Sequence, residues 1–199
     1  MNLARCRGLL RALAAGLFVI TACDFDFDGG LEPTGTPFTL NPSIAVVGIA
    51  GSLRHFSPNG QFALDMTIQS LTSSSVQDTL PAGLLLVSKQ NAVQHMVLVK
   101  PHIITANTTV TLAVLGTFCC NEHREIPNSA DSFRIGPITD NSGLNQLITL
   151  VRDKDISGNL GMVQRAVWLI TDSTGLTQAY LDSLNALPPD TLPSLRTNQ

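Results

Sequence analysis

The chain has 199 residues, of which 44% are hydrophobic and only 14% are charged, and its formal net charge is -3 at pH 7. Its basic residues are scattered, so no patch predicts binding to nucleic acid or electrostatic binding to a membrane surface. The length and the apolar content are sufficient for one compact domain with a sizeable core.

The amino-terminal segment has the features of an export signal. Three arginines in the first eleven residues precede an apolar run over residues 13–20, which is shorter than a comfortable membrane span. The run leads into Ile20-Thr21-Ala22-Cys23, which resembles the lipobox of bacterial lipoproteins. The resemblance implies that residues 1–22 are a cleaved signal peptide and that Cys23 is lipidated. The mature protein would then be anchored to the cell membrane on its extracytoplasmic side, in the periplasm or at the cell surface.

Residues 23–40 are predicted to be a lipidated tether. They combine alternating acidic residues with Pro33, Gly35 and Pro37 and show no hydrophobic periodicity. No later stretch has the apolar length of a transmembrane helix, so the lipid is the expected attachment to the membrane.

Residues 41–139 are predicted to form an Ig-like antiparallel β-sandwich. Apolar and polar residues alternate from residue 62 to residue 69, which indicates a strand with one buried face. Short apolar runs between turn-forming residues indicate further strands over 44–49, 83–88, 93–99 and 110–118.

After residue 140 the apolar residues recur at helical spacing, first from Leu144 to Val151 and then from Leu160 to Ile170. A third short helix is expected to begin after Thr177, which can serve as its N-cap. Residues 140–187 are therefore predicted to be a helical element packed on the sandwich. Residues 188–199 are predicted to be a disordered tail.

The adjacent cysteines Cys119 and Cys120 are the pair that remains once Cys6 is removed with the signal peptide and Cys23 is acylated. Neighbouring cysteines cannot staple distant strands, so an ordinary framework disulfide is excluded. A redox role or a metal site with His123 is one hypothesis, although adjacent thiolates lack the usual spacer of a zinc site. We expect no metal and no cofactor, and a vicinal disulfide is a further alternative.

Two segments resemble the thioester (TQXA-type) domain of Gram-positive surface adhesins. The first is Phe118-Cys119-Cys120-Asn121 with a proline downstream, and the second is Val163-Gln164-Arg165-Ala166-Val167-Trp168 followed by Thr171-Asp172. The resemblance implies an internal thioester between Cys119 and Gln164, with Asn121, Trp168 and Asp172 in supporting or shielding positions. The alternative is an ordinary amphipathic helix on which Gln164 bonds to a backbone carbonyl.

Three functions are compatible with these patterns. The first is a non-enzymatic lipoprotein whose sandwich binds a protein or another component of the cell envelope, because exported sandwiches commonly serve as recognition modules. The second is a covalent adhesin whose thioester acylates amines on a target surface. The third is the redox or metal role of Cys119 and Cys120. No motif of an enzyme active site is present, and we predict that the protein is not an enzyme.

Overall fold

The structure is a computed structural model that describes residues 31–54, 57, 59–172 and 175–191. The expected signal peptide, the lipidation position Cys23 and residues 192–199 of the expected tail lie outside the described residues. In chain order the described elements are β1 (Gly35–Thr36), β2 (Ile44–Gly51), β3 (Phe62–Ser70), β4 (Val76–Leu80), β5 (Leu84–Ser88), β6 (Met96–Val97), β7 (His102–Ala106), β8 (Thr111–Cys119), β9 (Phe133–Thr139), α1 (Ser142–Val151), the short 3-10 helix η1 (Ser157–Asn159), α2 (Leu160–Thr171) and α3 (Gln178–Asn185).

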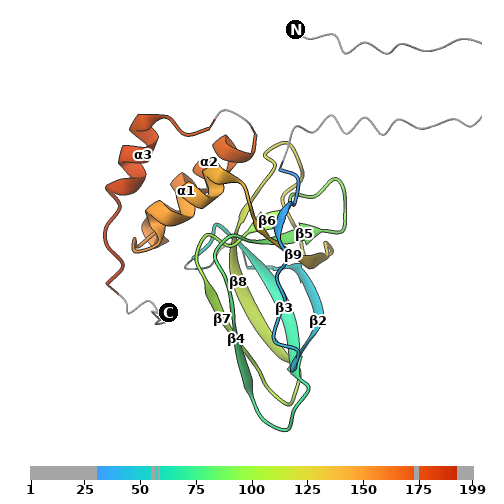
Figure 1. The fold of residues 1–199 in the computed structure, drawn as a ribbon. Coiled ribbons are helices and arrows are strands. Elements are labelled where there is room, and N and C mark those ends of the chain that lie inside the picture. The colour runs from blue at the N-terminus through green and yellow to red at the C-terminus, as the bar shows by residue number, and fades with distance from the viewer. Residues whose placement is uncertain (1–30, 55–56, 58, 173–174, 192–199) are drawn as a thin grey trace, which may run out of the picture.

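The described strands form two antiparallel sheets. One has the order β1-β9-β5-β6-β8-β3-β2, and the other consists of β4 and β7. The expected fold class, an Ig-like antiparallel β-sandwich followed by a small C-terminal helical element, is confirmed in that the protein is mainly β and its helices follow the strands. Figure 1 shows the three α-helices grouped at one end of the molecule, above the long strands.

The larger sheet bends because β8 takes part in both of its halves. From Thr111 to Thr117, β8 pairs with β3, whereas its last two residues pair with β6. At the edge of the sheet, β2 approaches the start of β9 through an antiparallel bridge between Ala50 and Ser132. The sheet therefore curls back on itself around an apolar core, which β4 and β7 also line.

A second core lies between the helices and the part of the sheet formed by β5, β6 and β9. Leu84 and Leu86 of β5 belong to the first core, whereas Leu85 and Val87 belong to the second. Every residue of β5 is buried, because one face of the strand packs on strands and the other packs on helices. This double burial explains why the run over 83–88 is continuously apolar instead of alternating.

The apolar residues that recur at helical spacing in the sequence form the buried faces of α1 and α2. In α1, Leu144, Leu147 and Val151 are buried, and in α2 the buried set includes Val163 and Val167. The predicted N-cap of the third helix is confirmed, because the Thr177 side chain accepts a hydrogen bond from the backbone N–H of Tyr180. Among the described residues no helix has both the length and the hydropathy needed to cross a membrane.

Residues 188–190, which the sequence assigns to a disordered tail, are held against the loop that follows α1. The Asp155 N–H donates to Pro188 O (2.8 Å), and the Asp190 N–H donates to Asp153 O (2.9 Å). Beneath this pairing the buried Lys100 donates to the carbonyls of Arg152 and Lys154, at 2.7 Å each, and its Nζ lies 4.0 Å from Asp190 Oδ2.

A buried ammonium needs acceptors on several sides. The two carbonyls accept from Lys100, and the carboxylate of Asp190 adds an opposite charge close by, so the ion pair supports the backbone bonds that hold this part of the C-terminal segment.

Candidate functional site

The two segments singled out in the sequence meet where β8 extends past its partner β3. The last residue of β8 that pairs with β3 is Thr117. At Cys119, the edge of β8 that faces β3 therefore has no partner strand. On the opposite edge, the Cys120 N–H donates to His95 O (2.8 Å). Successive residues of a strand direct their backbone groups to opposite edges. The N–H and C=O of Cys119 therefore point away from β6, into a gap in the sheet.

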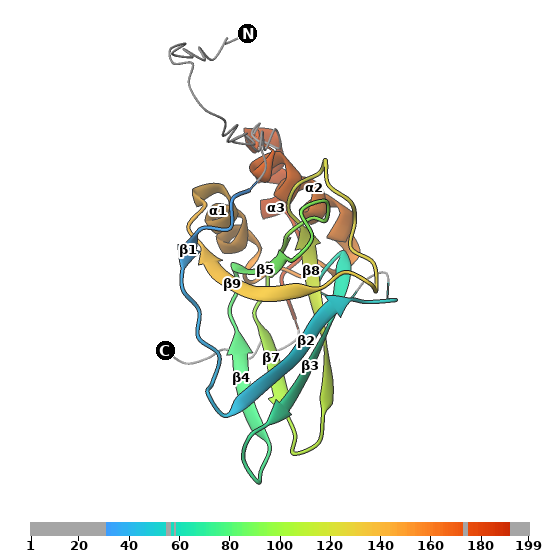
Figure 2. The same ribbon diagram turned by 90° about the vertical axis from the view of Figure 1, so that its right-hand side faces the viewer.

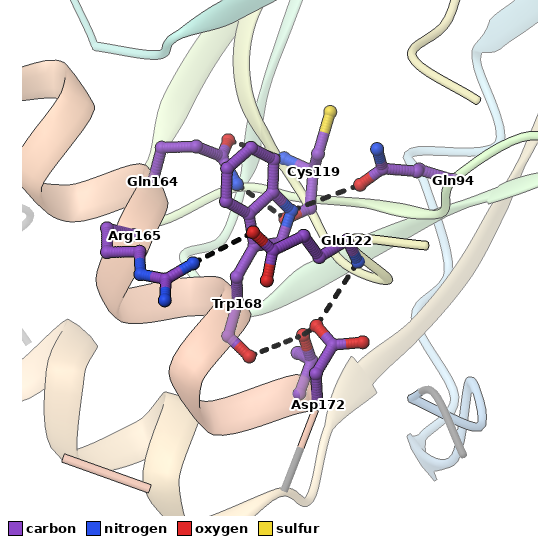
Figure 3. Close-up of polar contacts among 8 residues, drawn as sticks. Gln94, Cys119, Glu122, Gln164, Arg165, Trp168 and Asp172 are labelled. Atoms are coloured by element: carbon purple, nitrogen blue, oxygen red, sulfur yellow. Dashed lines mark hydrogen bonds and ion pairs between the residues drawn. The ribbon is translucent and has the colours of Figure 1, made fainter. Parts of the chain in front are cut away.

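The side chain of Gln164 fills this gap. The Cys119 N–H donates to Gln164 Oε1 (2.9 Å), and Gln164 Nε2 donates to Cys119 O (2.8 Å). A carboxamide carries one acceptor and one donor group on the same plane, so it can pair with a strand residue much as a neighbouring strand would. Both groups are buried, and Gln164 thus joins α2 to the end of β8 (Figure 3).

The same face of α2 makes two more polar contacts, since residues four apart lie on one side of a helix. One turn after Gln164, Trp168 Nε1 donates to Gln94 Oε1 (3.1 Å). One turn further, Asp172 Oδ2 accepts from the Glu122 N–H (3.2 Å), as Figure 3 shows. The face therefore holds both the loop before β6 and the turn after β8.

Gln94 links Trp168 to the segment between β8 and β9, because it is hydrogen-bonded to both. It is almost completely buried, its Nε2 donates to Arg124 O (2.9 Å), and its backbone N–H donates to Glu125 O (3.0 Å). Arg165 adds an ion pair with Glu122 at 2.8 Å, but both side chains are substantially exposed, so this pair contributes little. The buried amides, rather than the surface charges, fix the connection.

The two thiols lie in different cores. The side chain of Cys119 belongs to the sandwich core and that of Cys120 to the core beneath the helices. In Figure 3 the Cys119 sulfur points away from the Gln164 carboxamide. The two sulfurs are on opposite faces of the chain, an arrangement that does not favour a bond between them or a shared ion.

Burial also governs the protonation of both thiols. Burial, with a smaller contribution from the neighbouring Cys120, raises the pKa of the Cys119 thiol well above its ordinary value. Burial raises the pKa of Cys120 too, and the carboxylate of Asp172 adds to the effect. Because the thiolate is the nucleophile, both cysteines are poor nucleophiles in this state.

Asn121 shapes the turn that follows the cysteines. Its backbone has a φ of 107°, a region that asparagine tolerates better than most residues. In the amide orientation that satisfies both groups, its nitrogen donates to Cys120 O and its oxygen accepts from the Leu31 N–H, at 2.8 Å each. The start of the described chain is therefore attached to the turn after β8.

His95 lies buried beside this turn. Its Nδ1 accepts a hydrogen bond from the Ser88 N–H (3.2 Å), which requires an unprotonated nitrogen at that position. Burial, together with the nearby charges of Arg124 and Arg134, lowers the pKa of His95 from 6.5 to about 4. The histidine is thus neutral at physiological pH.

The structure brings together the residues that the resemblance named, namely Cys119, Asn121, Gln164, Trp168 and Asp172. It places His123, the third residue of the metal hypothesis, at the exposed surface, away from the two buried thiols. Within the described ranges no group of three His, Cys, Asp or Glu side chains is arranged to hold a metal ion.

Sequence reasoning missed Gln94 and Glu122. A signal for Gln94 was present, because it is a polar residue directly after Val93 within an apolar run.

No protein-family model matches this chain, and no curated protein or solved structure matches it either.

Replacing Gln164 with methionine should remove both hydrogen bonds while keeping the length and the helix propensity of the side chain. The N–H and C=O of Cys119 would stay buried without partners, so the free energy of unfolding should fall by about 3 kcal/mol. The matched control is Arg165→Ala, which removes only the exposed ion pair and should cost less than about 1 kcal/mol. Denaturant unfolding measures both changes. Equal effects of the two substitutions would show that the carboxamide does not complete the edge of β8.

The neutral state of His95 predicts a loss of stability in acid. Because its folded pKa lies below its unfolded value of 6.5, the unfolded chain binds the proton first. Stability should therefore fall as the pH drops from about 6.5 to about 4. The full shift corresponds to about 3 kcal/mol, which solvent screening of this partly accessible group should reduce to about 2 kcal/mol.

The measurement is the free energy of unfolding at pH 7 and at pH 4 for the wild type and for His95→Gln, which should lose less stability than the wild type in acid. His102, whose pKa burial also lowers, provides the control, because His102→Gln should retain the contribution of His95. A pH dependence unchanged by His95→Gln would contradict the assignment.

Proposed function

We propose that the protein is an extracytoplasmic lipoprotein, attached to the membrane through a lipid on Cys23, whose β-sandwich serves as a non-enzymatic binding module in the cell envelope. The observation that carries the proposal is the packing of Leu31, the described residue nearest in sequence to Cys23. Leu31 packs against the core beneath the helices. Figure 1 shows the helices at the end of the molecule opposite the β3–β4 and β7–β8 turns.

Cys23 precedes Leu31 by eight residues, which span at most about 28 Å when fully extended. A lipid on Cys23 would therefore keep the helical end of the protein near the membrane. The long strands and their far turns would project away from it, into the space where a partner can reach them.

The candidate reactive side chains support this choice, because the contacts that they make are packing and hydrogen bonds. Both thiols are buried and protonated, Gln164 completes a sheet edge, and His95 is neutral and enclosed. A binding module requires none of these groups to react.

Lipidation can be tested by the mass of the mature protein made in a bacterial host. The wild type should begin at position 23 and carry the added mass of a diacylglycerol or a triacyl modification, and Cys23→Ser should carry none. Cys6→Ser is the matched control, since it changes a cysteine that the signal peptidase would remove and should leave the mature mass unchanged. A wild-type protein that retains Met1, or that begins elsewhere without lipid, would refute the proposal.

One observation favours a second candidate function, a covalent adhesin. The chain brings Cys119 and Gln164 together although 44 residues separate them in the sequence, as the resemblance to thioester domains requires. In the reaction the Cys119 thiolate would attack the carboxamide carbon of Gln164, the C–N bond would break, and ammonia would leave with the thiol proton. The Cys119 sulfur would first have to turn out of the sandwich core, and the carboxamide would have to give up its two hydrogen bonds.

Intact mass decides between the two candidates. A thioester lowers the mass by one ammonia, and methylamine should open it by forming an amide on Gln164 and releasing the thiol. Cys119→Ser and Gln164→Glu should both lack the deficit, whereas Cys120→Ser, the matched control, should keep it. From the hydrogen bonds and the thiol orientation we expect the wild type to have the full mass of its sequence, and a deficit that methylamine removes would establish the adhesin instead.

A further inference from the structure

The third helix, α3, is the least buried of the three α-helices. It has 8 residues, of which Leu184 alone is buried, whereas α1 buries three side chains and α2 buries five. Helices shorter than about twelve residues are marginal in water without tertiary contacts. Figures 1 and 2 show α3 grouped with α1 and α2, and in Figure 1 the chain after α3 runs back past the end of α1. Contacts outside α3 must therefore help to keep it in place.

These contacts lie on both sides of Leu184 in residues 177–190, which we call the strap. In the first half of the strap, the Tyr180 hydroxyl donates to Met162 O in α2 (2.8 Å). After α3, Leu187 is buried in the core beneath the helices. The strap then ends in an antiparallel bridge with the loop that follows α1. Few side chains thus anchor the strap, and its last contact is made by backbone groups.

The loop that follows α1 offers the strap an edge like that of a strand, because its backbone groups alternate between two sides. On one side, the carbonyls of Arg152 and Lys154 accept from the buried Lys100. On the other side, Asp153 O and the Asp155 N–H pair with the strap. Such alternation is typical of a strand between two neighbours. The ammonium of Lys100 takes the place of the inner neighbour, and the strap is the outer one.

The end of the strap lies beside Lys100. The side chain of Lys100 is only 7% exposed, and its Nζ lies 4.0 Å from Asp190 Oδ2. Burial lowers the pKa of Lys100, and the carboxylates of Asp190, Asp153 and Asp155 oppose this shift. A buried ammonium that loses a compensating carboxylate is destabilised, so the charge of Asp190 favours the closed position of the strap.

We propose that the strap opens as one unit while the rest of the fold stays intact, and that its pairing with the loop beside Lys100 is the latch that holds it closed. Segments with few buried apolar contacts open at a lower free energy than the core does. Because α3 packs on α1 and α2, opening would uncover the apolar surface on which Leu184 and Leu187 lie. The protein would then have a closed and an open state that differ in this surface.

This inference goes beyond the proposed function and does not rest on it. The latch consists of contacts within the chain, so it requires neither a lipid on Cys23 nor a partner of the sandwich. The two proposals can therefore fail separately.

The amine of Lys100 reports directly on the latch. The mature protein is treated briefly with acetic anhydride, and acetylation of each lysine is followed by mass spectrometry. Lys89 is exposed and serves as the internal standard. In the wild type, Lys100 should react at least about tenfold more slowly than Lys89, because its amine reaches the reagent only when the strap is open.

Asp190→Asn removes the charge beside Lys100 and should raise the acetylation rate of Lys100 about tenfold. A chain that ends after Leu187 lacks the whole latch and should react faster still. The matched control is Asp182→Asn, the same change within α3, where the carboxylate accepts from Gln178 Nε2 (2.8 Å) at the exposed surface. The control should leave the rate within about twofold of the wild type.

Native-state hydrogen exchange tests whether the strap opens as a unit. The hydrogen-bonded amides of α3 should exchange with one common rate, faster than the amides of α1 and α2. Asp190→Asn should accelerate the exchange of α3 about tenfold and leave that of α2 unchanged. Circular dichroism shows whether each variant is folded. If the truncated chain is not, Asp190→Asn decides alone.

Three results would overturn the inference. An acetylation rate of Lys100 that Asp190→Asn does not change would show that the latch does not control access to the amine. Exchange of α3 at the rate of α1 and α2 would show that the strap opens only when the whole protein unfolds. Equal acceleration of all three helices by Asp190→Asn would make the contact a general source of stability instead of a latch.

Discussion

The pairing of the Gln164 carboxamide with the backbone of Cys119 joins the two parts of the molecule where strand pairing ends. β8 is the strand shared by both halves of the bent sheet, and its last residues have to extend past β3 in order to reach β6. The cost is an unpaired N–H and C=O in the interior, which a protein must satisfy. A side chain from α2 does so, and this requirement fixes where α2 can dock. The contacts of Trp168 and Asp172 then follow from helical spacing alone.

The same contact explains why Cys119 and Gln164 can lie close together without being placed to react with each other. The carboxamide of Gln164 is hydrogen-bonded to the backbone of Cys119. The thiol is close to the carboxamide only because it belongs to the same residue as that backbone. A reaction also needs an aligned thiolate, and near-attack geometry is what confers most of the advantage of proximity. Here the sulfur packs in the sandwich core, burial keeps it protonated, and both atoms of the carboxamide are already used. In the described structure the two residues match the reactive pattern in sequence and in space, while the contacts that they make are core packing and hydrogen bonds.

The sequence predicted those elements whose apolar residues recur at the spacing of the face that they bury. Alternation revealed β3, and helical spacing revealed α1 and α2, because each of these elements buries one face. β9 was missed, since it contains Gly136 and Pro137, residues that normally indicate a turn. The run over 93–99 gave only the two-residue strand β6, although the Leu98 N–H still donates to Leu84 O (3.0 Å) beyond the strand's end.

For the site, the sequence predicted that the cysteine and glutamine segments meet. The alternative role of Gln164, a hydrogen bond to a backbone carbonyl, is the one that the structure shows, but the sequence did not indicate that the carbonyl belongs to Cys119. The direction of the Cys119 thiol depends on which face of β8 meets the helices, and the partners of Gln94 and Lys100 come from distant loops. These features depend on three-dimensional packing, which a linear pattern does not encode.

The faces of the sheet differ in whether other parts of the chain cover them, and this difference connects the fold to the proposed function. The sheet formed by β5, β6 and β9 is covered by the sandwich core on one side and by helices on the other, and the turn after β8 is tied to the start of the described chain through Asn121. Within the part of the chain that the structure describes, neither core covers the outer side of β3, where Asp65, Thr67 and Gln69 are only partly buried.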